Sequence, residues 1–320
     1  MPSRVFIDGE AGTTGLRIRE HLAARADVTV VSVPYEQRRD VEARTALLND
    51  VDLAILCLPD DAAREAALLV SNARVKVLDA SSAHRTAEGW AYGFPELGRG
   101  QRDAIRTAPR VSNPGCHATG FVASLRPLID AGLVPADAPL AVNSLSGYSG
   151  GGKDLIRVHE EELAPQGRAG CALYGLELGH KHLPEMQRWS GLSRAPLFIP
   201  TVGNFRCGLV TSVPLQLSAL PGSVKAVDVH AALFEHYRGE PFIRVLPLND
   251  RSLLRAERYL DADVLNGSNY LELFVFAEEP KRQALVVARF DNLGKGASGA
   301  AVQNMNLMLG LPERAGLDPS

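Results

Sequence analysis

The chain has 320 residues, of which 46% are hydrophobic and 22% are charged, and its net charge is −3. This composition is typical of a globular protein with one large domain or two ordinary ones. Acidic and basic residues are mixed along the whole chain, which argues against nucleic acid or a membrane surface as a partner.

The four cysteines, Cys57, Cys116, Cys171 and Cys207, are far apart in the sequence. No pair has the CxxC spacing of a zinc or iron–sulfur site, so we expect no metal and no disulfide framework. The amino terminus lacks the basic and apolar regions of a signal peptide, and no apolar stretch approaches the length of a membrane span. We therefore expect a protein of the reducing cytoplasm.

Apolar runs alternate with helical segments through the first third of the chain. The predicted strands are 4–8, 27–33, 51–58 and 75–79, and the predicted helices between them are 16–25 and 60–72. Continuous apolar strands that alternate with helices indicate a parallel sheet covered on both faces. We predict an α/β, doubly wound, Rossmann-type nucleotide-binding domain.

The pattern changes after Pro114. We predict helices over 116–131 and near 226–236, and strands over 140–145, 209–217, 271–277 and 284–291. This irregular order favours an α+β domain with a mixed, largely antiparallel sheet. The segment 297–309 is predicted to be an amphipathic helix that packs back on the first domain. The expected domains are thus 1–114 with the carboxyl-terminal helix, about 297–320, and a catalytic and dimerisation domain over 115–296.

A glycine-rich turn, GEAGTTG, follows the first predicted strand. Gly9, Gly12 and Gly15 allow a tight turn that brings the backbone close to a pyrophosphate at the start of a helix. Thr13 and Thr14 add hydroxyl groups at the same place. A glycine turn after a strand is often only a turn, but its position in an alternating domain favours dinucleotide binding.

The end of the second predicted strand bears on the choice of cofactor. An NAD enzyme usually has an acidic residue here to bind the ribose hydroxyls, whereas this chain has Ser32 followed by Arg38 and Arg39. A hydroxyl and two arginines suit a 2′-phosphate, so we predict NADP as the cofactor. The alternative is that the arginines form a solvated helix start.

The segment SNPGCHAT contains the candidate nucleophile, Cys116. Pro114 and Gly115 break the preceding segment, so a helix is expected to begin at or just after Cys116. The free N–H groups and the dipole at a helix amino terminus stabilise a thiolate and an oxyanion. The alternative is a small apolar cysteine in a loop. His117 is a poor candidate for the base, because adjacent residues on a helix point in different directions.

Two histidines in HKHLPE, His180 and His182, are candidates for the general acid–base. In an extended segment their imidazoles would lie on one side, just before a helix that Pro184 and Glu185 could open. A two-histidine metal site lacks a third ligand at a sensible spacing. Both could also be surface histidines.

These motifs resemble those of the N-acetyl-gamma-glutamyl-phosphate reductases, in the shorter of their two sequence types. Besides SNPGC and the glycine turn, the matching segments are DASSAHR at 79–85, YGFPEL at 92–97, SGYSGGGK at 146–153, HKHLPE at 180–185 and LGKGASGAAVQN at 293–304. The resemblance spans nearly the whole chain. It implies a Rossmann-type NADP-binding domain joined to a catalytic domain like that of glyceraldehyde-3-phosphate dehydrogenase.

The resemblance also implies an activity and several roles. The reaction is the reduction of N-acetyl-gamma-glutamyl phosphate to the semialdehyde in arginine biosynthesis, through a thioester on Cys116. His180 is favoured over His182, because the match with Tyr174 and Glu185 centres on it. The nicotinamide side would be held by Asn292, Gly294 and Gly296, and a homodimer or homotetramer is expected.

A substrate with a carboxylate and an acyl phosphate needs cationic donors nearby. Arg85 follows the fourth predicted strand, at the edge where ligands bind in such domains. Further candidates for substrate contact are Asn113, Ser146, Ser149, Lys153, Tyr174, Glu185 and Arg206. Any of the cations could instead be a surface charge.

Two other functions remain open at this point. Aspartate-semialdehyde dehydrogenase shares the implied fold and thioester chemistry, but GC at the nucleophile and the ending GKGASGAAVQN argue against it. A non-enzymatic NADP-sensing protein would also retain the fold. The intact Cys116 and the paired histidines argue against that reading.

Overall fold

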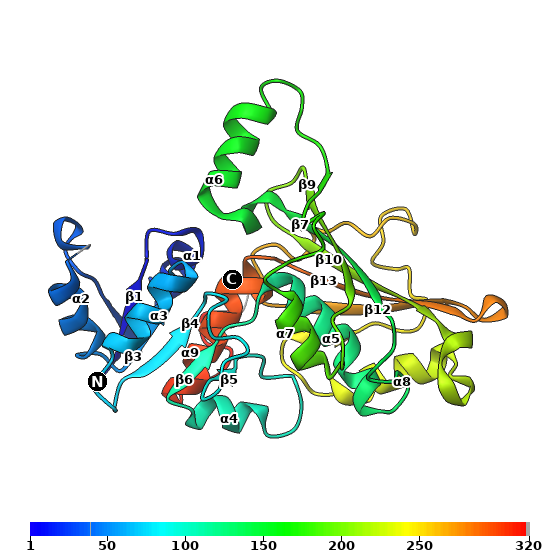
Figure 1. Cartoon of the computed structure of the whole chain (residues 1–320), viewed down its shortest axis with the longest axis horizontal. Helices are drawn as coiled ribbons and strands as arrows, with labels where there is room; N and C mark the ends of the chain where they lie inside the picture. The colour runs from blue at the N-terminus through cyan, green and yellow to red at the C-terminus, as the bar shows by residue number, and fades with distance from the viewer. Residues whose placement is uncertain (39, 318–320) are drawn as a thin grey trace. The chain divides into compact units, whose positions relative to one another are not determined.

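The computed structural model describes residues 1–38 and 40–317, and it divides into two compact units. The first unit contains residues 1–95, 99–115 and the described residues from Ala297 onward, and the second contains 96–98 and 116–296. Figure 1 colours the chain from blue at the amino terminus to red at the carboxyl terminus, so the first unit is blue, cyan and red.

The first unit is built on a six-stranded parallel sheet with the order β2-β1-β3-β4-β6-β5. Its strands are β1 (Ser3–Asp8), β2 (Val28–Val31), β3 (Leu53–Leu56), β4 (Lys76–Asp79), β5 (Ala91–Tyr92) and β6 (Arg110–Ser112). Its helices are α1 (Thr13–Leu22), α2 (Val41–Leu48), α3 (Asp60–Leu69), α4 (Gln101–Thr107) and α9 (Gly299–Leu309), with a short 3-10 turn η1 (Tyr35–Gln37). The predicted doubly wound sheet is confirmed.

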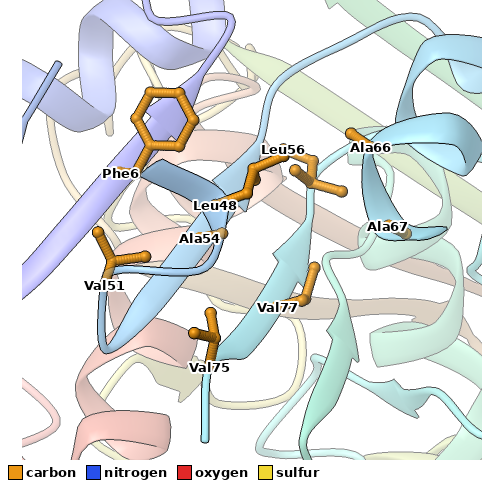
Figure 2. Packing of buried hydrophobic residues seen from close by; sticks show 9 residues of the cluster. All are labelled: Phe6, Leu48, Val51, Ala54, Leu56, Ala66, Ala67, Val75 and Val77. Carbon is orange, nitrogen blue, oxygen red and sulfur yellow. The ribbon is translucent and has the colours of Figure 1, made fainter. Parts of the chain in front are cut away.

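Both faces of this sheet are buried, which explains its continuous apolar strands. Figure 2 shows the core on one face, where α2 and α3 cover β1, β3 and β4; its residues are Phe6, Leu48, Val51, Ala54, Leu56, Ala66, Ala67, Val75 and Val77. Side chains alternate along a strand, so Leu53 and Ile55 point to the opposite face, and both are fully buried. On that side α1 packs against β1 and α9 packs against β4.

The carboxyl-terminal helix differs from the prediction. The helix α9 is present within 297–309, but it is not amphipathic, because every residue from Gly299 to Met308 is buried. It packs against α1, α4 and β4, which belong to its own unit (red in Figure 1). Its polar side chains are satisfied internally: Asn304 Nδ2 donates to Gly93 O at 2.7 Å and to Asn113 Oδ1 at 3.0 Å.

The second unit contains a seven-stranded sheet with the order β11-β12-β13-β10-β7-β9-β8. Its strands are β7 (Ala141–Gly147), β8 (Ala172–Leu173), β9 (Leu197–Gly203), β10 (Leu209–Gln216), β11 (Ile243–Val245), β12 (Leu271–Glu278) and β13 (Gln283–Phe290). The pairs β7–β9 and β11–β12 are parallel and the other four pairs are antiparallel, so the predicted mixed, largely antiparallel sheet is confirmed.

The helices of the second unit are α5 (Cys116–Asp130), α6 (Gly152–Arg157), α7 (Leu183–Ser190) and α8 (Ala226–His236), with a π-helical turn η3 (Val158–Leu163) after α6 and another, η7 (Gly294–Ser298), at the end of the unit. Helix α5 lies between the sheet and its neighbours: it packs on β7, β10 and β13 and against α7 and α8 (Figure 1). Short 3-10 turns, η2 (Tyr148–Gly151), η4 (Leu217–Ala219), η5 (Pro221–Ser223) and η6 (Glu279–Lys281), complete the unit.

Helix α5 continues through Pro127, as in the predicted helix 116–131, although proline disfavours the interior of a helix. Proline has no N–H, so the carbonyl of Ala123 loses its intrahelical donor. The hydroxyl of Tyr237 donates to this carbonyl at 2.9 Å and replaces the missing bond. Because of this replacement, a helix of 15 residues keeps its full length behind Cys116.

Candidate active site

The glycine turn after β1 forms the predicted start of a helix. Gly9 has φ +89°, and a Cβ there would lie 2.3 Å from Cys57 O. A Cβ at Gly15 would lie 2.6 Å from Gly9 O, and Gly12 N donates to Gly9 O at 2.9 Å. Glycine is therefore required at both ends of the turn. Helix α1 begins at Thr13, three residues earlier than predicted.

The start of α1 suits a pyrophosphate. No side chain caps the helix at Gly12, and the Thr13 hydroxyl is buried with no hydrogen-bond partner among the described residues. Free backbone N–H groups, the positive end of the helix dipole and a buried hydroxyl are the donors that a phosphate anion needs. Thr14 is half-buried beside it. These residues fit the dinucleotide that the sequence predicts.

The residues after β2 are arranged around Glu10, which sequence reasoning missed. Ser32 Oγ donates to Glu10 Oε2 at 2.8 Å, and Arg19 forms an ion pair with the same carboxylate. Arg38 is exposed, and Arg39 lies outside the described residues. Ser32 thus lies at the glycine turn, and the cation that pairs with Glu10 is Arg19 of α1.

The segment after β4 gathers polar groups at the carboxyl edge of the sheet. Asp79 is fully buried and bonds to Ser81 and to His84 Nδ1, the latter at 2.7 Å. Arg85 is also buried, and its Nε donates to Asn113 O at 3.0 Å. The structure therefore brings Arg85 to Asn113, as two candidate substrate contacts. The Asn113 side chain, however, bonds to Ala297 O and to Asn304, so its amide holds the fold.

Cys116 is the first residue of α5 and is half-buried. Its thiol therefore lies at the amino terminus of a long helix, where the dipole and backbone N–H groups favour the thiolate. The π-helical turn η7 approaches it closely, since a Cβ added at Gly296 would lie 2.9 Å from Cys116 Cβ. Glycine at 296 permits this contact. Gly294 fits against Ser268, whose carbonyl oxygen would lie 2.1 Å from an added Cβ.

A cluster of rings lies around the start of α5. The centroid of the His117 ring is 5.8 Å from that of His180 and 5.6 Å from that of His182, and these two are 4.8 Å apart. Tyr174 lies 5.9 Å from His180, and Phe198 contacts both His117 and His180. The structure therefore brings together the predicted His180, His182 and Tyr174, and adds His117.

His117 is held by hydroxyl groups on both sides. Its Nδ1 lies 2.7 Å from Ser144 Oγ and its Nε2 lies 2.9 Å from Tyr174 Oη. Burial, together with a smaller effect of the charge of His180, lowers the pKa of His117 to about 3. His117 is thus a neutral imidazole at ordinary pH.

The two predicted acid–base histidines lie on a turn and not in an extended segment. His182 has φ −86° and ψ −11°, and its N–H donates to His180 Nδ1 at 3.1 Å. The turn arises because α7 begins directly after His182. His180 Nδ1 accepts a hydrogen bond, so the neutral ring carries its proton on Nε2. His180 is half-buried, whereas His182 is buried.

Several predicted contact residues have structural partners. Asn292 Oδ1 accepts from Gly208 N at 2.8 Å, and its Nδ2 donates to Ser149 Oγ at 3.0 Å. Ser146 Oγ donates to Gly147 O, and Glu185 is buried in the first turn of α7. These bonds fix the loop after β7 against β10 and β13.

The two remaining cations lie at the surface of the second unit. Lys153 is exposed on α6. Arg206 is also exposed and forms an ion pair of 2.8 Å with Glu160, which also accepts from the Tyr148 hydroxyl. Exposed pairs of this kind are weak, so Arg206 remains able to exchange Glu160 for another anion.

Among residues 1–38 and 40–317, no group of three or more His, Cys, Asp or Glu side chains is arranged to hold a metal ion. In the same part of the chain, none of the helices is both long enough and apolar enough to cross a membrane.

Comparisons with known proteins show the family and the fold. The family model described as "Semialdehyde dehydrogenase, NAD binding domain" matches residues 23–108, and "Semialdehyde dehydrogenase, dimerisation domain" matches residues 116–292. Among solved structures, aspartate semialdehyde dehydrogenase II from Vibrio cholerae has a TM-score of 0.72 at 18% identity, covering 97% of this chain and 99% of that chain. The enzyme from Candida albicans, solved with NADP, has a TM-score of 0.65 at 14% identity, covering 97% and 99%. These structures share the fold.

Curated relatives are much closer in sequence. N-acetyl-gamma-glutamyl-phosphate reductase 2 of Nostoc sp. is 52% identical over 318 residues, covering 98% of this chain and 99% of the relative. The protein of the same name from Pseudomonas putida is 51% identical over 306 residues, covering 96% of each. The chain therefore belongs to the semialdehyde dehydrogenase family, and within it to the N-acetyl-gamma-glutamyl-phosphate reductases.

Proposed function

We propose that this chain reduces N-acetyl-gamma-glutamyl phosphate to N-acetylglutamate 5-semialdehyde and phosphate with NADPH, as a step of arginine biosynthesis. The observation that carries the proposal is Cys116 at the amino terminus of α5, beside the cluster of Tyr174, His180 and His182. Relatives that carry this reductase name and are about half identical over nearly the full length support the substrate.

The first step uses Cys116. Its thiolate attacks the acyl carbon, the bond from that carbon to the phosphate oxygen breaks, and phosphate leaves with the electron pair. A thioester on Cys116 remains. Backbone N–H groups at the start of α5 stabilise the negative charge that develops on the carbonyl oxygen during this attack.

His180 is proposed as the acid–base group. When the thioester is reduced, its oxygen becomes an alkoxide that takes a proton and returns it as the carbon–sulfur bond breaks. His180 Nε2 carries a proton in the neutral ring, since Nδ1 accepts from His182 N. His182 is buried and holds this orientation, so we assign the proton transfer to His180.

The residues of the first unit suit the cofactor. When bound, NADPH supplies the hydride that reduces the thioester. Gly9, Gly12 and Gly15 bring the backbone close to the pyrophosphate, and the hydroxyls of Thr13 and Thr14 donate to it. Ser32 and Arg38 bind the 2′-phosphate. To do so, the Ser32 hydroxyl gives up its hydrogen bond to Glu10 and donates to the phosphate instead. Gly294, Gly296 and Asn292 shape the nicotinamide side.

Cationic and polar side chains bind the rest of the substrate. Arg85, Lys153 and Arg206 are proposed to neutralise the phosphate and the carboxylate. Asn113, Ser146, Ser149 and Glu185 are proposed as polar contacts of the substrate, and their side chains are buried.

A phosphate-dependent assay in the reverse direction tests the proposal. N-acetylglutamate semialdehyde, phosphate and NADP are mixed with the protein, and reduced cofactor is followed by absorbance. We expect reduction that needs phosphate and is lost in Cys116→Ala. A reaction with aspartate semialdehyde in place of the acetylated aldehyde would move the chain to the alternative activity. Tight NADP binding without turnover of either aldehyde would favour a sensing protein.

The assembly and location belong to the same proposal. A homodimer or homotetramer is supported by the match of residues 116–292 to a dimerisation domain, and light scattering should give two or four times the chain mass of 34.4 kDa. A reducing cytoplasm suits the chemistry, because Cys116 acts as a free thiolate.

A further inference from the structure

A hydrogen-bonded chain of three side chains lies behind Cys116, and the reaction above gives it no role. It runs from Ser144 on β7 through His117 on α5 to Tyr174 after β8, over distances of 2.7 and 2.9 Å. Ser144 and His117 are buried, with exposed fractions of 1% and 4%. At its inner end, Ser144 Oγ lies 3.0 Å from Thr211 Oγ1 on β10. The chain is therefore anchored on two strands of the sheet.

The chain has a defined direction because His117 is neutral. A neutral imidazole has one donor nitrogen and one acceptor nitrogen, so the two hydroxyls that flank it take opposite roles. The flanking hydroxyls belong to Ser144 on one side and Tyr174 on the other. When His117 Nε2 donates to the Tyr174 oxygen, the phenol hydrogen does not bond to His117 and can be donated to another acceptor.

Tyr174 is the outer end of the chain, and it bonds to His117, the residue that directly follows Cys116 on α5. Burial raises the pKa of Tyr174 above its usual range, and the nearby charge of Cys116 raises it further. The phenol thus keeps its proton beside a thiolate and acts as a donor, not as an acid or base. Tyr174 itself is 37% exposed and follows β8, a two-residue strand at the edge of the sheet, where its N–H donates to Pro200 O at 3.2 Å.

We infer that His117 and Ser144 are positioning residues that hold the Tyr174 hydroxyl as a hydrogen-bond donor to the reacting atoms at Cys116. His117 cannot face the sulfur as the next residue on the helix, but the same geometry turns its ring toward Tyr174. In the proposed reaction, Tyr174 stabilises first the thiolate and then the oxygen of the thioester as charge develops there. Stabilisation of the thioester oxygen rests on the proposed function, whereas the hydrogen bond from Tyr174 to the Cys116 thiolate does not.

The thiolate gives a readout that is independent of turnover. The rate of Cys116 alkylation by iodoacetamide, measured against pH, reports the pKa of its thiol. The background is Cys171→Ser, because Cys171 is exposed whereas Cys57 is half-buried with a pKa raised to about 12 and Cys207 is buried. Loss of a donor to the thiolate raises the thiol pKa, so we expect Tyr174→Phe to shift the profile upward by about 1 unit.

A double-mutant comparison separates positioning from packing. His117→Phe should give the same upward shift as Tyr174→Phe, and the double variant should shift no further, because His117 acts through Tyr174. His117→Gln, whose amide replaces the Nε2 donor, should recover part of the shift. Tyr259→Phe removes an exposed phenol of the same unit and serves as the control, with an unchanged profile. Circular dichroism confirms that each variant is folded.

The outcomes distinguish the two proposals. In the reductase assay, Tyr174→Phe and His117→Phe should lower kcat by about 10- to 100-fold with little change in KM, as expected for a donor that acts on developing charge. An unchanged alkylation profile in both Tyr174→Phe and His117→Phe, or additive shifts in the double variant, would overturn the inference. Coupled shifts in a protein that reduces no acyl phosphate would support the positioning role and reject the proposed substrate.

Discussion

Cys57 and Cys116 show how position alone decides the reactivity of a residue. Cys57 directly follows β3, and burial, together with the smaller effects of the charges of Asp79 and Asp8, raises its pKa to about 12. Cys116 begins α5, where the dipole acts in the opposite direction. The sequence predicted the second environment, because Pro114 and Gly115 lie next to the thiol. The environment of Cys57 could not be predicted, since the carboxylates of Asp79 and Asp8 lie at the ends of other strands.

At the same scale, the buried His117 makes stability depend on pH. Its pKa is about 3 in the folded protein against 6.5 for an ordinary histidine, so below 6.5 the unfolded chain binds more protons than the folded one. Folding stability should therefore fall as pH decreases from 6.5 toward 3, by about 1.4 kcal/mol per pH unit from this group alone.

Urea unfolding at a series of pH values measures this slope. His117→Gln should reduce the slope between about pH 6 and about pH 4 by nearly that amount, because the titrating ring is gone. Ser144→Ala keeps the imidazole buried and should retain the slope. Equal slopes in the wild type and in His117→Gln would show that the ring is not held neutral.

At the scale of elements, the π-helical turn η7 is fixed by an ion pair that sequence reasoning missed. Lys295 Nζ lies 2.8 and 2.9 Å from the two carboxylate oxygens of Glu96, and both side chains are completely buried. Both residues belong to the second unit, and Glu96 O accepts a hydrogen bond from His236. The pair therefore holds the turn that brings Gly296 to Cys116.

Removing one partner of this pair should be costly. Lys295→Met leaves the Glu96 carboxylate buried without its counter-charge, and we expect a loss of about 3–5 kcal/mol in the free energy of unfolding. The double variant with Glu96→Gln should recover a large part of this loss, since no buried charge remains. Chemical denaturation of the single and double variants gives the coupling energy.

An exposed ion pair of the same unit provides the comparison. Arg255 and Asp261 are 63% and 33% exposed, and Arg255→Ala should lower the free energy of unfolding far less than Lys295→Met. A Lys295→Met variant as stable as Arg255→Ala would contradict the assignment of a buried, paired charge.

The elements that the sequence predicted well are those with a strong local pattern. The strands β1, β3 and β4 are short apolar runs because they are covered on both faces, and α5 and α8 have helical periodicity. Strand β9 was not predicted, since Pro200 interrupts its pattern with a residue that cannot donate to the sheet. The complete burial of α9 was also not predicted. Asn304 and Asn306 are polar, yet both are buried and bond to the backbone of the first unit.

At the scale of the whole molecule, the sequence indicated candidate site residues in short motifs but not the partners that lie far away in the chain. Cys116, His180 and His182 stand in short motifs, so their type and spacing carry information. The chain from Ser144 to Tyr174 joins residues that lie 27 and 57 positions away from His117, and only the folded sheet brings them together. Partners that lie so far away in the chain leave no local sequence pattern. The sequence therefore indicated no role for His117 other than that of a base.

Cofactor binding should stabilise the folded chain as a whole. A ligand that binds only the folded state adds RT ln(1 + [L]/Kd), which is about 2.7 kcal/mol at 100 times Kd. We expect NADP to raise the unfolding midpoint in a thermal scan, and NAD at the same concentration to raise it less, because Ser32 and Arg38 favour a 2′-phosphate. Gly15→Ala should lose the NADP-dependent shift, since the added Cβ would lie 2.6 Å from Gly9 O. Gly170→Ala meets no atom within 4 Å and should keep the full shift. Equal shifts with NAD and NADP would reject the NADP preference, and a full shift in Gly15→Ala would reject the glycine turn as the binding site.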